Sequence, residues 1–385
     1  MSVRDLLIAL VRYAIKGEAL DKSAVEAALN SEKLATLYKV AKGHDVAHLV
    51  AYSLMKNAIV FDGTVWQLFL KELEQAKLRY EMIQADTTEI YSCLEKEGIE
   101  YIPLKGAVIR SYYPEPWMRT SCDIDILVKK ENLDRAIDAL VQNCHYTTDH
   151  KITYHDVSLY SPFGMHLELH FNINENISKY DAVLEQVWEY SCVSNESAFK
   201  YLQNVEFLTF HMTAHSAYHF VSGGCGLRSV LDLWILKQSL GNEALRLEEL
   251  LEKAELSRFY NGICELGEYW FGEKQLTSHT VEEMQKYVLL GGAYGTRGQG
   301  IASGKAKHGS RFKYYLSRMF LPYSNMAVLY PVLKKHKILL PFCHIARWFC
   351  GIFKRKKIKN ELEILSSISK EKEEHMNALM TELGL

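Results

Sequence analysis

At residues 119–128 the chain reads RTSCDIDILV, and this stretch decides its fold. The apolar residues predict a buried strand, in which residues i and i+2 point to the same face of a sheet. Asp123 and Asp125 therefore project together, whereas Ile124 and Ile126 point to the opposite face. Two like charges this close repel each other unless a cation lies between them, and paired carboxylates suit Mg²⁺ or Mn²⁺. The stretch therefore predicts a metal site.

The residues before this strand predict a seat for phosphate. Residues 99–104 form a predicted short strand, Lys105 and Gly106 a tight turn, and residues 107–113 a short helix that stops at Pro114. A strand that passes through a glycine turn into a helix presents backbone N–H groups and the positive end of the helix dipole to an anion. We expect Gly106 to face phosphate, whereas Lys105 is either a phosphate contact or an ordinary exposed lysine.

A third carboxylate follows in a predicted hairpin. Residues 153–160 and 165–171 form two predicted strands, joined by the turn residues Ser-Pro-Phe-Gly at 161–164. Apolar and polar side chains alternate in the second strand, which places Glu168 on the polar face. Glu168 is expected to complete the metal site or to accept a proton from an attacking hydroxyl. Arg119 is either a substrate contact or a salt-bridge partner of the aspartates.

These motifs resemble a known superfamily. Leu-Lys-Gly at 104–106, Arg-x-Ser-x-Asp-Ile-Asp at 119–125 and Leu-Glu-Leu-His at 167–170 are similar to the DNA polymerase beta-like nucleotidyltransferases. The resemblance is closest to the branch of uncharacterised bacterial nucleotidyltransferases. It covers residues 98–172 firmly, and residues 207–234 and the C-terminal helices more loosely.

The resemblance implies a division of roles among these residues. Asp123 and Asp125 would hold two metal ions, Glu168 would be the third carboxylate, and Gly106 with Ser121 would face the triphosphate. The turn departs from the superfamily, because its usual Gly-Gly or Gly-Ser is replaced here by Lys-Gly-Ala.

Composition bounds the class of protein. The chain has 385 residues, of which 48% are hydrophobic and 24% charged, which is typical of a soluble globular protein with room for two or three domains. Its net charge of −2 provides no overall field for nucleic acid, so long duplex DNA or RNA is not an expected partner. Eight cysteines without a Cys-x-x-Cys pair, no signal-peptide layout and no long uncharged apolar run predict a cytoplasmic protein without a spanning helix.

The distribution of apolar residues predicts an α+β fold. A small mixed β-sheet would form the nucleotidyltransferase core, embedded between N-terminal and C-terminal helical regions. We place the N-terminal helical region at residues 1–97, the αβ core at 98–178 and the C-terminal helical region at 179–385. Gly98 is expected to end the last N-terminal helix.

Residues 205–221 predict a buried helix, because they are apolar nearly all round. His211, His215 and His219 recur at i, i+4 and i+8 on one stripe. They are either a zinc site or hydrogen-bonded histidines at the floor of the cleft, and we favour the second because no further zinc motif accompanies them. In the resembling family a histidine-bearing helix follows the catalytic unit, which implies that His211 and His215 lie near the nucleotide.

The next predicted helix places Arg228 and Asp232 on one face, after the glycine-rich loop at residues 222–226. Opposite charges at this spacing stabilise a helix by about 0.2–0.5 kcal/mol, so an ion pair is one reading. The other reading is a contact to the base, the ribose or the acceptor.

The C-terminal region is rich in basic residues. Residues 291–311 lack the spacing of a P-loop and predict a loop over the mouth of the site, with cationic side chains at Arg297, Lys305, Lys307 and Arg311. Basic clusters at 334–337 and 354–357 flank apolar helices. Such helices either contact an anionic membrane surface or pack on the protein, and we favour packing on the catalytic lobe.

The sequence thus predicts a Mg²⁺-dependent (or Mn²⁺-dependent) nucleotidyltransferase that moves an NMP from an NTP to a hydroxyl or phosphate acceptor and releases pyrophosphate. A sugar, an antibiotic, an RNA end or a protein side chain would each serve as the acceptor. The alternatives are a metal-dependent phosphohydrolase, which would also use clustered carboxylates, and a non-catalytic nucleotide-binding scaffold.

Overall fold

The structure is a computed structural model that describes residues 1–18, 20–241, 244–276, 278–292, 313, 316–317, 319–352 and 370–385. Two predicted features lie outside these residues. They are the cationic side chains of the loop predicted at 291–311 and the second basic cluster at 354–357.

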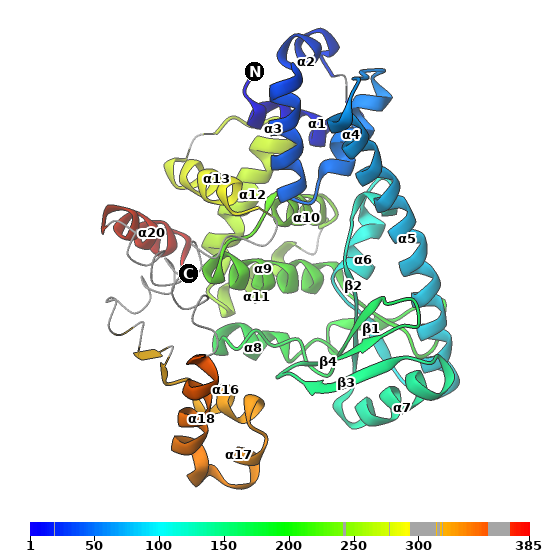
Figure 1. The fold of residues 1–385 in the computed structure, drawn as a ribbon, viewed down its shortest axis with the longest axis vertical. Helices are drawn as coiled ribbons and strands as arrows, with labels where there is room; N and C mark the ends of the chain where they lie inside the picture. Colours follow the sequence, from blue (N-terminus) through cyan, green and yellow to red (C-terminus); the bar gives the residue numbers. More distant parts are fainter. Residues whose placement is uncertain are drawn as a thin grey trace.

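The N-terminal region consists of helices, as predicted. Their bounds are α1 Val3–Lys16, α2 Lys22–Ala28, α3 Ser31–Gly43, α4 Ala47–Lys56 and α5 Thr64–Lys96. Helix α5 is 33 residues long and runs along one side of the molecule, from the other N-terminal helices down to the sheet (Figure 1). It stops where Gly98 adopts φ +63°, a left-handed conformation that glycine tolerates, so the predicted role of Gly98 is confirmed.

The sheet has five strands in the order β1-β2-β5-β4-β3. Their bounds are β1 Tyr101–Pro103, β2 Asp123–Val128, β3 Thr147–Ile152, β4 Asp156–Tyr160 and β5 His166–His170. Strand β2 pairs parallel with β5 and antiparallel with β1, and the other pairings are antiparallel, so the predicted mixed sheet is confirmed. Strand β3 was not predicted, because its sequence TTDHKI lacks the apolar alternation of a half-buried strand.

Short helices connect β1 to β2, and one longer helix follows β2. Their bounds are α6 Gly106–Ile109, η1 Arg110–Tyr112, η2 Pro116–Met118, η3 Lys130–Asn132 and α7 Leu133–Asn143. Helices α5 and α7 share an apolar core with one face of the sheet, to which Ile124 and Ile126 contribute with exposed fractions of 2% and 0%. The opposite face of the central strands is left for polar side chains.

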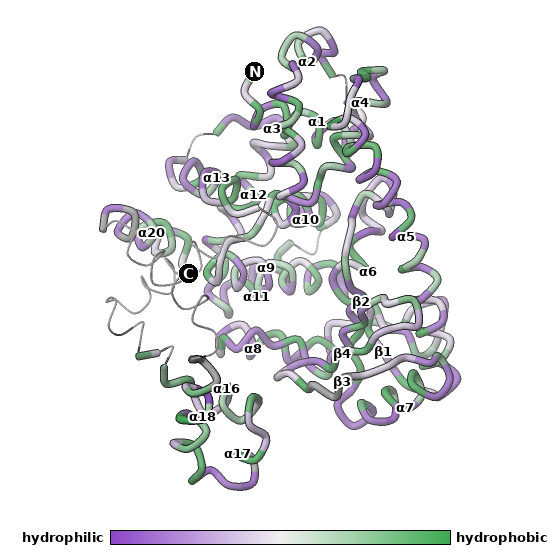
Figure 2. The backbone as a smooth tube through the Cα atoms, viewed as in Figure 1, coloured by the Kyte–Doolittle hydropathy of each residue, from purple (hydrophilic) through white to green (hydrophobic). Residues whose placement is uncertain are grey.

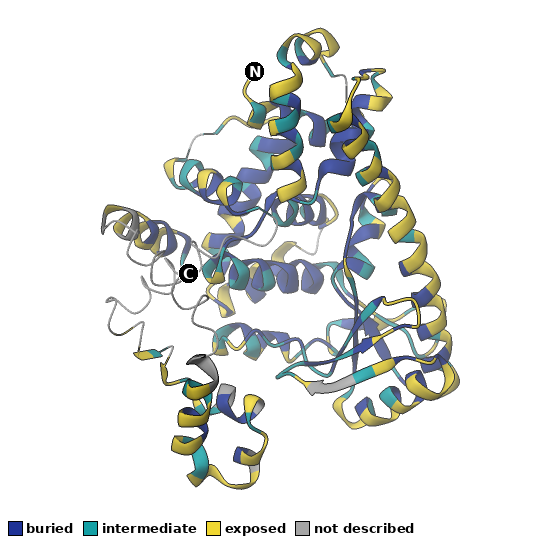
Figure 3. Cartoon of the chain, viewed as in Figure 1, coloured by how far each residue is buried: buried dark blue, intermediate teal, exposed yellow. Residues whose placement is uncertain are grey.

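The C-terminal region is also helical. It contains α8 Ser178–Leu184, a hairpin of β6 Ser191–Val193 and β7 Tyr201–Gln203, α9 Val205–Ser222, α10 Leu227–Gln238, α11 Ala244–Lys253, α12 Ser257–Phe271, α13 His279–Gly291 and α20 Lys370–Leu383. Helix α9 is buried along most of its length, as predicted (Figure 3). One apolar core joins these helices to α1, α3, α4 and the first half of α5. The proposed domain boundaries stay a prediction.

Three further helices, α16 Tyr323–Leu329, α17 Val332–Lys335 and α18 Leu340–Ile352, lie apart from this core (Figures 1 and 2). The turn η4 Lys337–Leu339 joins α17 to α18. We expected this region to pack on the catalytic lobe. Its buried side chains instead form a small apolar cluster of their own. No described helix is both long enough and apolar enough to cross a bilayer.

Candidate active site

The central strands of the sheet bring three carboxylates together. In the parallel pairing of β2 with β5, Asp125 lies opposite Glu168 and Asp123 lies opposite His166. Because partners in register share a face of the sheet, Asp123, Asp125 and Glu168 project to the same side. The predicted grouping of the three carboxylates is therefore present.

Two overlapping groups of side chains could hold a divalent cation. Asp123, His166 and Glu168 form one group, and Asp125, Glu168 and His170 form the other; in each, the ligand atoms lie within 4.8 Å of one another. Burial and then the charges of Asp125 and Glu168 raise the pKa of Asp123. This repulsion is what a bound cation relieves, and carboxylate oxygens are the ligands that Mg²⁺ and Mn²⁺ prefer. The donor set fits such an ion.

Asp125 is the most strongly paired of the three carboxylates. Its Oδ1 accepts hydrogen bonds from Lys105 Nζ and from His170 Nε2, both at 3.0 Å. Burial alone would raise the pKa of Asp125, but these two partners hold it well below its usual range. Lys105 is largely buried by these contacts, so the prediction of an ordinary exposed lysine is wrong.

His170 links the carboxylates to each other. Its Nε2 lies 3.0 Å from Asp125 Oδ1 and 3.5 Å from Glu168 Oε2. Burial alone would lower the pKa of His170, but the hydrogen bonds to Asp125 and Glu168 raise it. Strand spacing could have found this residue, because it stands two positions after Glu168 and so shares its face of β5.

The turn between β1 and α6 has a different backbone conformation from the one that we predicted. Lys105, not Gly106, has the left-handed φ of +43°, and α6 after it is only four residues long. Gly106 is favoured for a different reason: a Cβ there would lie 3.1 Å from Cβ of Ser121, so Ser121 would have to move by a few tenths of an ångström. Arg110 holds the two segments together by donating to Gly106 O at 2.7 Å and to Ser121 Oγ at 2.9 Å. Gly106 and Ser121 are thus neighbours, and both line the cavity described below; that they face a triphosphate stays a prediction.

Arg119 is held by a buried partner from the helical region. Its Nε lies 2.9 Å from Asp232 Oδ1, and Tyr113 donates its hydroxyl to the same oxygen at 2.7 Å. The prediction that Arg119 pairs with the metal-site aspartates is therefore wrong. Asp232 is 2% exposed and lies behind Arg119, outside the residues that line the cavity, so the structure does not place it as a direct substrate contact.

Arg228 faces the same cavity from α10. Its Nη1 lies 2.6 Å from Asp45 Oδ2, and Thr120 donates its hydroxyl to that carboxylate oxygen at 2.8 Å. Arg228 and Arg119 are both engaged with carboxylates from other segments, which fixes α10 beside the strand that carries Asp123 and Asp125.

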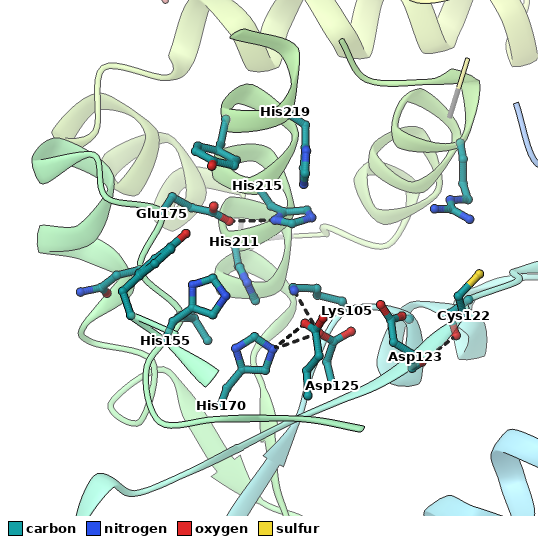
Figure 4. A pocket seen from close by; sticks show the side chains of 18 of the residues that line it. Lys105, Cys122, Asp123, Asp125, His155, His170, Glu175, His211, His215 and His219 are labelled. Atoms are coloured by element: carbon teal, nitrogen blue, oxygen red, sulfur yellow. Dashed lines mark hydrogen bonds and ion pairs between the residues drawn. The ribbon is translucent and has the colours of Figure 1, made fainter. Parts of the chain in front are cut away.

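Histidines of α9 form the opposite side of the cavity (Figure 4). His215 Nδ1 lies 2.7 Å from Glu175 Oε1, and His211 Nδ1 lies near the side-chain amide of Gln203. His219 packs edge-on against His215. Within the described parts of the chain, no candidate metal-binding group contains these three histidines. All three line the cavity, which agrees with the interpretation that we favoured, histidines at the floor of the cleft.

The α9 histidines are neutral groups. Burial, followed by the charge of Lys105, lowers the pKa of His211 and of His215 to about 3. Burial and His215 lower the pKa of His219 to about 4. Since a carboxylate accepts hydrogen bonds, Nδ1 of His215 carries the proton that it shares with Glu175, and its Nε2 is left as an acceptor.

We call the two halves of the site the sheet side, which consists of Lys105, Asp123, Asp125, Glu168 and His170, and the helix side, which consists of Glu175, His211, His215 and His219. Between them lies a cavity of about 380 Å³. Every predicted site residue except Asp232 lines it. Sequence reasoning did not select the remaining polar lining residues, which are Tyr154, His155, His170, Asn174, Glu175 and Tyr218.

A family model described as an uncharacterised nucleotidyltransferase matches residues 30–272, a range that contains both sides of the cavity. No curated protein and no solved structure matches the chain.

Proposed function

The chain belongs to the family of uncharacterised nucleotidyltransferases, and from this membership we propose that it transfers an NMP from an NTP to an acceptor hydroxyl in the cavity between the sheet side and the helix side. The observation that carries the proposal is the register of β2 and β5, which sets Asp125 opposite Glu168 with Asp123 on the same face. Three carboxylates in a cavity that also contains lysine and arginine suit an anionic substrate bound through a cation.

Asp123, Asp125 and Glu168 would hold Mg²⁺ or Mn²⁺. When bound, the cation lowers the pKa of the attacking hydroxyl and neutralises charge on the leaving pyrophosphate. His166 and His170 flank the carboxylates from the same strand and complete the two groups of donors.

The triphosphate is proposed to lie toward Gly106 and Ser121, as the resemblance implies. Lys105, Arg119 and Arg228 line this part of the cavity and supply positive charge. Lys105 contacts Asp125 directly, so its ammonium lies close to where the metal-bound phosphates would be. Asp232 contributes indirectly, because it fixes the orientation of Arg119.

The acceptor is proposed to enter along the helix side. His211, His215 and His219 are neutral, and Nε2 of His215 is an acceptor in the protonation state that Glu175 imposes. A hydroxyl can donate a hydrogen bond to this nitrogen, whereas a phosphate dianion cannot. The helix side therefore favours a hydroxyl over a phosphate as the acceptor group.

In the proposed reaction, a residue of the sheet side accepts the proton that the acceptor hydroxyl loses. The acceptor oxygen attacks the α-phosphorus, the bond from that phosphorus to the bridging oxygen of the β-phosphate breaks, and pyrophosphate leaves. Glu168 is the proposed recipient of the acceptor's proton, because its carboxylate is only partly buried and faces the cavity. Positioning and electrostatic stabilisation supply most of the acceleration in such phosphoryl chemistry.

The direct test is incorporation of label. Purified protein is incubated with each of the four NTPs labelled at the α-phosphate, with Mg²⁺ and with a small-molecule fraction or a macromolecular fraction of a cell extract. We expect labelled acceptor and pyrophosphate in equal amounts with one NTP. Release of orthophosphate alone, without label in any acceptor, would support the phosphohydrolase alternative.

Binding is measured separately by thermal unfolding. NTP and Mg²⁺ together should raise the melting temperature more than the sum of either alone, because the cation joins the carboxylates to the phosphates. At about 100-fold excess over Kd the stabilisation is about 2.7 kcal/mol. Binding without any transfer to acceptors from either fraction would favour the non-catalytic scaffold.

A further inference from the structure

The α16–α18 unit carries an apolar stripe on its outer surface. Ile338, Phe342, Ile345 and Phe349 are 85%, 67%, 44% and 64% exposed. Their spacing of four, three and four residues places them on one face of α18 and of the turn that leads into it. Large apolar side chains that gather on one exposed face mark an interaction surface, whereas scattered ones need no explanation.

This stripe is not simply a poorly packed core. The other face of α18 supplies Cys343 and His344, which are both buried, and Cys343 packs with Met326 and Leu333 of α16 and α17. Trp348 is also engaged, because its Nε1 donates to Met319 O at 2.9 Å. Helix α18 thus already has an inward face, and the exposed stripe is its outward face.

The sequence segment that contains the stripe carries charge of one sign. Residues 284–360 contain 16 Lys and Arg and no Asp or Glu, so all 47 acidic residues of the chain lie outside this segment. Lys335 and Lys337 stand directly before the stripe, and Arg347 lies on α18 itself. The rest of the protein is therefore acidic, whereas the segment that contains the α16–α18 unit is uniformly basic.

We propose that the α16–α18 unit docks on the surface of an anionic phospholipid bilayer. The stripe would insert its side chains at the level of the headgroups while Lys335 and Lys337 contact lipid phosphates. Helix α18 has 13 residues and so is about 20 Å long, which is too short to span a bilayer of about 30 Å and suits a helix that lies in its plane.

Two observations favour lipid over other anionic or apolar partners. RNA would reward the basic residues but not four exposed aliphatic and aromatic side chains along one helix face. A second copy of this chain would bury the stripe but would bring two basic segments together, which like-charge repulsion opposes. Only an anionic surface with an apolar interior complements both features.

The test is co-sedimentation of the full chain with vesicles. We expect binding to vesicles of phosphatidylcholine mixed with phosphatidylglycerol at low salt, little binding to phosphatidylcholine alone, and release at about 1 M salt, where the screening length falls to about 3 Å. Phe342→Ser with Phe349→Ser should weaken binding at low salt, although it leaves every charge in place. Lys335→Glu with Lys337→Glu should weaken it by about fivefold or more per residue at low salt.

Matched controls exist elsewhere on the surface. Phe163 is 81% exposed in the turn between β4 and β5, so Phe163→Ser controls for loss of an exposed aromatic. Lys71→Glu with Lys253→Glu controls for charge reversal at exposed lysines of α5 and α11. Both controls should bind vesicles as the wild type does, and all variants should keep the wild-type melting temperature.

Several outcomes would overturn the proposal. They are failure to bind anionic vesicles at low salt, equal loss of binding in the control variants, or binding to RNA that the Phe342 and Phe349 changes leave untouched. A dimer in solution that these two changes dissociate, without vesicle binding by the wild type, would assign the stripe to self-association. The outcome does not depend on the proposed transferase activity, because no active-site residue is altered.

Discussion

The sheet side and the helix side of the cavity differ in charge and in how the chain builds them. The sheet side is ionic: a lysine and a raised-pKa histidine meet three carboxylates, and all but Lys105 come from two adjacent strands. The helix side has neutral histidines and one carboxylate, Glu175, which is bonded to His215 across 40 residues of sequence. Charge is thus concentrated on the sheet side, where phosphoryl transfer needs it, whereas the histidines of the opposite side offer neutral hydrogen-bonding groups.

Substitutions on the sheet side are expected to have the largest effect on the rate of NMP transfer. Asp125→Asn or Asp123→Asn should lower transfer by about 10³-fold or more, because each removes charge that holds the cation without changing the side-chain volume. The measurement is incorporation of α-labelled NMP under saturating NTP. Asp138→Asn, at an exposed position of α7, is the matched control and should keep full activity. Near-normal transfer by both site variants would remove the metal site from the sheet side.

The next largest effect is expected at the buried ion pair that joins α10 to the segment before β2. Asp232→Ala leaves the buried guanidinium of Arg119 without its carboxylate, and loss of one partner of a buried ion pair costs about 3–5 kcal/mol. Chemical denaturation should show this loss in the free energy of unfolding.

An exposed ion pair provides the control for this prediction. Glu26→Ala removes the partner of Lys22 at the surface of α2 and should cost about 0.5 kcal/mol or less. If Asp232→Ala is equally mild, then Arg119 finds another partner and the joint between α10 and the sheet is weaker than its geometry indicates.

The same contrast explains what could be predicted from sequence. Strand periodicity is local, so spacing alone predicts that Asp123 and Asp125 share a face, whereas the grouping of Glu168 with them also rests on the family resemblance. Asp232 was misassigned because its i, i+4 spacing to Arg228 suggested a shared role, while burial actually pairs it with Arg119 from a distant segment. Glu175 escaped notice because no spacing rule connects it to His215, and β3 because its polar sequence has no strand pattern.

The helix side should respond differently from the sheet side. His215→Gln and Glu175→Gln each remove the oriented acceptor at Nε2 and should slow transfer by about 10–100-fold, the cost of an unmet hydrogen bond of about 1–3 kcal/mol. The thermal shift produced by NTP with Mg²⁺ should stay as in the wild type, since the sheet side is intact.

The control for the helix side is His279→Gln, at an exposed position of α13, which should change neither quantity. If His215→Gln abolishes the NTP-dependent thermal shift, then His215 contacts the nucleotide, as the family resemblance implied, and not the acceptor. Unchanged transfer in both Glu175 and His215 variants would remove the helix side from the reaction.

The smallest expected effect is a difference between Asp123 and Asp125 in how each contributes to the free energy of unfolding. In metal-free buffer, Asp123→Asn should raise the free energy of unfolding, because burial and the charges of Asp125 and Glu168 raise the pKa of Asp123 and so disfavour its ionised form in the fold. Asp125→Asn should lower it, because Lys105 and His170 stabilise the ionised form and hold its pKa low.

The sign of the pH dependence follows from these directions. A raised pKa in the folded state disfavours the ionised form, so the advantage of Asp123→Asn should be largest at about pH 7 and should shrink as the pH falls and Asp123 in the wild type becomes protonated. A lowered pKa gives stability that is present above the unfolded value and lost as the pH falls below it, so the cost of Asp125→Asn should also shrink in acid. Denaturation at about pH 7 and about pH 4 measures the first trend, and the second requires a further measurement at about pH 2, below the unfolded pKa of an aspartate. Equal effects of the two substitutions in metal-free buffer would mean that the repulsion is shared over all three carboxylates, whereas opposite signs would identify Asp123 as the position most in need of the cation.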